Sequence, residues 1–127
     1  MAEPRILIVD DEGDLAFTLA ERLQLRGFSA RGVTSGEAAI EVVQHESPDA
    51  VVLDVKMPGT GGLSVLRTLK SLRPHLPVIL VTGHGSRENA VEGMRLGAFR
   101  YLMKPVQIEE LVALLHEATR GPGGGDG

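Results

Sequence analysis

Acidic, hydroxyl and basic side chains stand at the ends of short apolar runs in this chain. Five of them close or directly follow such runs: Asp10, Asp11, Asp54, Thr82 and Lys104. An ionised group at the end of a buried run is costly, so it needs a partner cation, access to water or a chemical role. Three carboxylates at one edge would also raise one another's pKa values unless cations intervene.

A hard divalent cation answers this repulsion, because sites made only of oxygen ligands select Mg²⁺ or Ca²⁺. Calcium requires about six to eight oxygens, whereas magnesium keeps several waters and accepts phosphate oxygens. We therefore expect Mg²⁺. With the ion beside Asp54 and the ammonium of Lys104 opposite, an incoming phosphoryl group would be neutralised from two sides, and Thr82 could donate a hydrogen bond. The set suits phosphoryl transfer onto a carboxylate.

Each residue alone also has a structural explanation. Asp10 or Asp11 could cap a helix, and Asp54 could be an ordinary acid at a strand end. Thr82 could close a strand as a β-branched residue, and Lys104 could be a solvated loop cation. For each residue taken alone, the structural explanation is favoured. The occurrence of all five residues at strand ends instead favours a functional site.

The elements that must position these residues alternate along the chain. Continuous apolar runs typical of strands buried on both faces occupy 5–10, 50–54 and 77–82, and weaker strand patterns occupy 28–33 and 99–104. A helical periodicity follows each run. This alternation predicts a doubly wound α/β domain, with a parallel sheet between two layers of helices. Sites in such sheets form at the carboxyl ends of the strands.

Helix-boundary residues agree with this division. Gly27 and Gly97 are placed to end helices, and Thr34 with Glu37 has the spacing of a capping box. We expect one domain over residues 1–120. The segment GPGGGDG, 121–127, is expected to be a flexible glycine-rich tail or a linker stub.

Composition excludes several classes of function. The net charge is −4 without a basic run, and one Tyr, three Phe and no Trp leave few rings for stacking on bases, so direct nucleic-acid binding by this segment is not expected. No apolar run approaches the roughly 20 residues of a membrane span, and no signal pattern opens the chain. Together with the absence of cysteine, these features predict a cytoplasmic protein without a membrane segment.

Four motifs occur in one order: ILIVDDE, DAVVLDVKMPGTGGL with its D-x-x-M-P-x-x-x-G pattern, VILVTGHG and GAFRYLMKP. In these motifs the chain resembles the receiver domains of two-component response regulators, over residues 4–120. The resemblance implies a flavodoxin-like, five-stranded sheet in 2-1-3-4-5 order flanked by five helices. It also implies that a phosphohistidine on a sensor histidine kinase phosphorylates Asp54.

The resemblance further assigns metal ligands. It implies that Asp11 and Asp54 bind Mg²⁺ directly, that Asp10 acts through a bound water, and that the backbone carbonyl of Lys56 completes the protein ligands.

A switch is implied by the same resemblance. Lys104 pairs with the acceptor carboxylate or phosphate, and its bond to Pro105 is cis. Thr82 moves toward the phosphoryl oxygens and vacates space into which Tyr101 turns.

The expected output surface comprises the fourth helix, fifth strand and fifth helix, which would contact a fused or separate output domain or form a homodimer. We expect a signalling domain rather than a turnover enzyme, one that accepts phosphate from small donors and loses it slowly. The alternatives are a Mg²⁺-dependent phosphatase that passes through an aspartyl phosphate, and a docking module that acts without phosphorylation.

Overall fold

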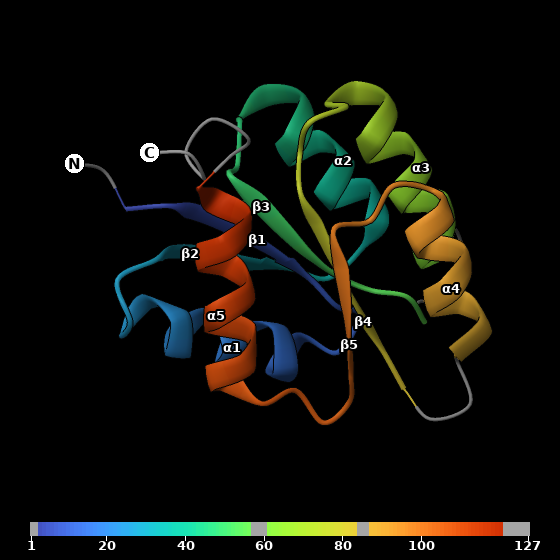
Figure 1. Cartoon of the computed structure of the whole chain (residues 1–127). Helices are drawn as coiled ribbons and strands as arrows, with labels where there is room; N and C mark the ends of the chain where they lie inside the picture. The colour runs from blue at the N-terminus through green and yellow to red at the C-terminus, as the bar shows by residue number, and fades with distance from the viewer. Residues whose placement is uncertain (1–2, 57–60, 84–86, 121–127) are drawn as a thin grey trace.

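The computed structural model of the chain describes residues 3–56, 61–83 and 87–120 (Figure 1). Five parallel strands form one sheet in the order β2-β1-β3-β4-β5, which confirms the predicted fold class. The strands are β1 (Arg5–Val9), β2 (Ser29–Val33), β3 (Ala50–Asp54), β4 (Val78–Thr82) and β5 (Arg100–Met103). Each lies within one residue of its predicted bounds at either end. The predicted tail, 121–127, and the Met-Pro pair of the second motif lie outside the described residues.

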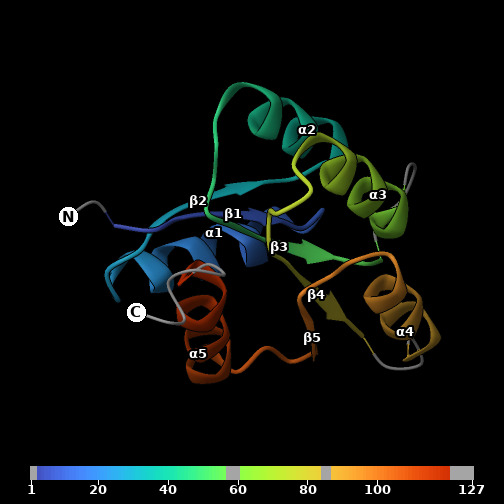
Figure 2. The same ribbon diagram turned by 45° about the horizontal axis from the view of Figure 1, so that its top comes forward.

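Helices cover both faces of the sheet (Figure 2). One face is covered by α1 (Gly13–Gln24) and α5 (Ile108–Thr119). The other is covered by α2 (Gly36–His45), α3 (Gly62–Leu72) and α4 (Arg87–Arg95). Within the described ranges, none of the helices combines the length and the apolar character needed to cross a bilayer.

The apolar runs supply two cores at once, because successive side chains of a strand point to opposite faces. In β1, Leu7 and Val9 pack beneath α2 and α3, whereas Ile6 and Ile8 pack against α1 and α5. All residues of β3 and β4 are buried. The runs are therefore apolar without alternation because the central strands have no solvent-exposed face.

Helix ends follow local backbone requirements. Gly27 and Gly97 have φ values of 91° and 109° and end α1 and α4, as predicted. The amide of Phe28 donates to the carbonyl of Leu23 at 3.1 Å, which is the hydrogen bond expected after a left-handed glycine. The predicted capping box at Thr34 is wrong by one residue. The N-cap of α2 is Ser35, whose hydroxyl accepts from the amide of Ala38 at 3.0 Å.

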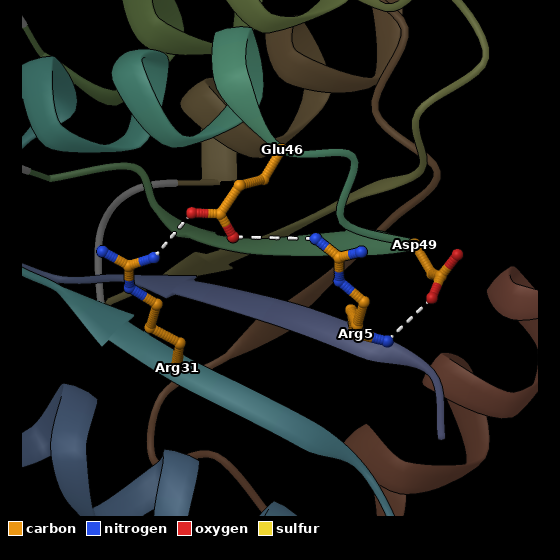
Figure 3. Close-up of polar contacts among 4 residues, drawn as sticks. All are labelled: Arg5, Arg31, Glu46 and Asp49. Atoms are coloured by element: carbon orange, nitrogen blue, oxygen red, sulfur yellow. Dashed lines mark hydrogen bonds and ion pairs between the residues drawn. The ribbon is translucent and has the colours of Figure 1, made fainter. Parts of the chain in front are cut away.

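Exposed polar contacts connect neighbouring elements near the start of β1 (Figure 3). The Glu46 carboxylate lies between two guanidinium groups, 3.0 Å from that of Arg31 and 3.6 Å from that of Arg5. Asp49 accepts a hydrogen bond of 2.7 Å from the amide of Arg5. Such exposed pairs contribute little energy individually. They connect the end of α2 and the entry to β3 with the two neighbouring strands.

Candidate functional site

The strand order reverses direction between β1 and β3. From β1 the chain proceeds to β2 on one side, and all later strands are added on the other side, so the crossovers on either side of this point cover opposite faces. Binding sites of open parallel sheets form at such a switch point, here at the carboxyl ends of β1 and β3. Asp10 directly follows β1 and Asp54 is the last residue of β3. The topology therefore places both carboxylates at this switch point.

Three carboxylates meet there. Asp10, Asp11 and Asp54 each offer a carboxylate oxygen, and these oxygens all lie within 4.8 Å of one another. Asp10 and Asp54 are only 4% and 3% exposed, whereas Asp11 is exposed. One face of the cluster is therefore enclosed by protein and another is open to solvent.

Backbone amides orient the two buried carboxylates. The amide of Glu12 donates to Asp10 Oδ1 at 2.9 Å, and the amide of Lys56 donates to Asp54 Oδ1 at 3.0 Å. In both cases the donor lies two residues after the acid, the short-range pattern that Asp side chains favour where a strand gives way to a turn.

A lysine partly compensates the buried charge. Lys104 Nζ lies 3.3 Å from Asp54 Oδ2, and the lysine side chain is 28% exposed. Its amide donates to the carbonyl of Thr82 at 2.7 Å, which holds the end of β5 beside the end of β4. The Lys104–Pro105 peptide bond is cis, as the resemblance implied.

The pKa of Asp10 is raised from 3.8 to about 6. Burial is the largest cause, because it disfavours the charged carboxylate, and the neighbouring charges of Asp54 and Asp11 add to it. The hydrogen bond from Glu12 and the charge of Lys104 act in the opposite direction. Burial and the neighbouring carboxylates thus outweigh the hydrogen bond from Glu12 and the charge of Lys104.

Thr82 and Tyr101 occupy different environments. Thr82 ends β4 and is fully buried, and its hydroxyl donates to the sulfur of Met103 at 3.1 Å. Tyr101 lies on β5 opposite Leu80 and is 37% exposed. The Thr82 hydroxyl thus contacts Met103, a residue that sequence reasoning missed. The sequence pattern could have indicated this contact, because residues two apart on a strand point to the same face. Met103 follows Tyr101 by two residues and pairs with Thr82 on the neighbouring strand.

The last glycine of the D-x-x-M-P-x-x-x-G pattern has a steric function. Gly62 begins α3 directly against the end of β3, and its amide donates to the carbonyl of Val55 at 3.0 Å. A Cβ atom at this position would lie 2.5 Å from the carbonyl oxygen of Asp54 and equally close to two backbone atoms of Val55. Only glycine permits this close approach behind the acidic cluster.

The structure thus brings Asp10, Asp11, Asp54 and Lys104 together and places Lys56 beside them through its backbone amide. This fold and this site define a flavodoxin-like α/β domain with an acidic cluster and a paired lysine at its switch point. The profile of the response regulator receiver domain matches residues 6–116. The chain therefore belongs to the response regulator receiver domain family.

Individual relatives agree. The chain is 39% identical to the response regulator MprA of Mycolicibacterium vanbaalenii, over 96% of this chain and 54% of the relative. It is 37% identical to the regulatory protein AtoC of Escherichia coli, over 91% of this chain and 25% of the relative. A receiver domain protein from Clostridium thermocellum superposes with a TM-score of 0.86 at 34% identity, over 92% of this chain and 94% of that one. The chain thus spans about half or a quarter of the length of these two sequence relatives.

Proposed function

We propose that this chain is a phosphorylation-dependent signalling switch whose acceptor is Asp54. A phosphohistidine on a sensor histidine kinase is the natural donor. A carboxylate oxygen of Asp54 forms a bond to phosphorus while the bond between phosphorus and the imidazole nitrogen breaks, and the imidazole leaves. The supporting observation is the placement of Asp54, a buried carboxylate 3.3 Å from an ammonium group and adjacent to two further carboxylates.

The acidic cluster fits Mg²⁺, because three carboxylate oxygens within 4.8 Å of one another are hard ligands of matching charge. Asp11 and Asp54 would hold the ion directly, Asp10 would act through a water, and the carbonyl of Lys56 would complete the set. When bound, the ion neutralises charge on the phosphoryl oxygens. The raised pKa of Asp10 supports this assignment, since burial and the adjacent carboxylates of Asp54 and Asp11 disfavour its charged form, which a bound cation would stabilise.

The remaining residues bind the phosphoryl group or change conformation in response to it. Lys104 keeps Asp54 oriented and then pairs with a phosphoryl oxygen. Thr82 donates its hydroxyl to another oxygen, and Tyr101 turns toward the space that Thr82 vacates. Such a local charge event shifts the population of two conformations.

The output surface is formed by α4, β5 and α5. Val91, Met94 and Tyr101 are large apolar or aromatic side chains exposed on α4 and β5. A homodimer or an output domain would cover them. The relatives continue well beyond the length that this chain matches, which supports an output domain as the partner.

Phosphoryl uptake tests the proposal directly. With Mg²⁺ and acetyl phosphate, the protein is expected to gain a single phosphoryl group per chain, and a chelator is expected to prevent the gain. Intact-mass spectrometry measures both results. Rapid release of inorganic phosphate without accumulation of the modified chain would instead indicate the alternative function, a Mg²⁺-dependent phosphatase. Absence of both modification and release would overturn the proposal that the chain is a phosphorylation-dependent switch.

The affinity for Mg²⁺ is expected to depend on pH through Asp10. Protons compete with the cation for this carboxylate, whose pKa is about 6 in the metal-free protein. Affinity should be nearly constant above about pH 7 and fall by up to about tenfold per pH unit below about pH 6. Calorimetric titration across this range measures the effect.

The Asp10→Asn variant is the control for this prediction, because it lacks the titrating group and should bind Mg²⁺ weakly with a flatter pH profile. The pH dependence of folding stability in the metal-free protein independently checks the direction of the Asp10 pKa shift. Because the folded pKa lies above the unfolded one, the contribution of Asp10 favours folding below about pH 3.8 and is lost as the pH rises through about 6. An Mg²⁺ affinity that stays constant from pH 7 to about pH 5 would contradict the assignment.

A further inference from the structure

The hydroxyl of Thr82 is already engaged in this structure. Its oxygen lies 3.1 Å from Met103 Sδ, and Thr82 is fully buried. A threonine hydroxyl has a single hydrogen to donate. While that hydrogen is directed at the sulfur, it cannot be donated to a phosphoryl oxygen on Asp54. The two acceptors are therefore mutually exclusive partners of one donor.

Sheet geometry makes this contact specific. Thr82 and Met103 are direct cross-strand partners on β4 and β5, and Leu80 and Tyr101 are the preceding pair on the same face. Met103 thus lies next to both residues of the proposed switch. It is 43% exposed, so its side chain extends from the buried hydroxyl toward solvent.

We infer that Met103 is a positioning residue that holds the Thr82 hydroxyl away from the acceptor site until a phosphoryl group is present. The inference rests on the proposed function, since it concerns the same transfer to Asp54. Met103 contacts Thr82 and acts through it, without a role in bond making.

The thioether sulfur of Met103 suits a hydrogen bond that is made in the resting protein and broken on phosphorylation. A thioether is a weak acceptor, so a charged phosphoryl oxygen outcompetes it. The contact nevertheless matters in the resting protein, because a buried hydroxyl with no acceptor is destabilising. The unbranched methionine side chain can also change rotamer when Thr82 leaves. Leucine is of similar size and apolar but offers no acceptor at all.

The Met103→Leu variant separates this role from packing. In the unphosphorylated variant, the Thr82 hydroxyl has no acceptor. In the phosphorylated variant, a phosphoryl oxygen accepts its hydrogen bond. Uptake of phosphate from acetyl phosphate with Mg²⁺ should therefore accelerate by about fivefold, the rate equivalent of one lost neutral hydrogen bond. The rate of phosphate loss should stay within about twofold of wild type, because Thr82 contacts the phosphoryl group both before and during hydrolysis. Phosphorylated fractions followed over time by mass spectrometry give both rates.

Two comparisons complete the test. Leu25→Met makes the reverse exchange at an exposed leucine that follows α1 and should leave both rates unchanged. In a Thr82→Val background, Met103→Leu should have no further effect, since no hydroxyl remains to be released. Equal uptake by wild type and Met103→Leu, or an acceleration that persists without the hydroxyl, would overturn the inference while leaving the acceptor assignment intact. A wild-type protein that takes up no phosphoryl group would instead overturn the proposed function.

Discussion

The Asp54→Asn variant is expected to take up no phosphoryl group from acetyl phosphate, even at saturating Mg²⁺. Asparagine keeps the size of the side chain and can still accept the hydrogen bond from the amide of Lys56, which is 3.0 Å from Asp54 Oδ1. It has no nucleophilic carboxylate, however, and a neutral amide does not form the 3.3 Å ion pair with Lys104. Intact-mass spectrometry should show only the unmodified chain.

The matched control is Asp49→Asn, which neutralises an acid that lies outside the cluster and accepts from the amide of Arg5. That variant should be phosphorylated like the wild type. A circular dichroism spectrum and a melting curve establish that Asp54→Asn is folded. Stoichiometric modification that persists in folded Asp54→Asn would remove Asp54 as the acceptor and would require a different nucleophile.

The apolar runs were sufficient to predict the sheet, because a parallel sheet covered on both faces leaves little room for polar residues in its central strands. The residues that end these strands could be predicted to meet for a related reason, since parallel strands direct their carboxyl ends to one edge. Asp54 and Lys104 are 50 residues apart in sequence and still form an ion pair. Strand order itself came from the resemblance, because periodicity does not determine which strands are neighbours.

Side-chain detail could not be predicted in the same way. Asp10 and Asp11 are neighbours of one type, yet one is buried and the other exposed, which depends on how the chain turns after β1. Ser35 rather than Thr34 caps α2 because the helix begins one residue later than the pattern indicated. The contact between Thr82 and Met103 depends on strand register and on rotamers. Each of these features is decided by tertiary packing.

Gly62→Ala is expected to destabilise the fold strongly. The added Cβ would lie 2.5 Å from three backbone atoms of Asp54 and Val55, which cannot move aside as the end of a flexible side chain can. Overpacking against backbone should lower the free energy of unfolding by about 3 kcal/mol. For a domain of this size, the melting temperature should fall by about 10 °C. Thermal melts followed by circular dichroism measure the change.

Gly13→Ala provides the matched comparison, because Gly13 begins α1 as Gly62 begins α3, but its added Cβ would make ordinary contacts at 3.4 Å or more. Alanine favours helix more than glycine does, so this variant should be as stable as wild type or slightly more stable. The difference between the two variants isolates the contact with β3. Because that contact includes the carbonyl of Asp54, Gly62→Ala should also slow phosphoryl uptake at temperatures where the protein remains folded. Equal melting temperatures for the two variants would show that α3 can move away from β3, and the glycine would then have no steric role in positioning the acceptor.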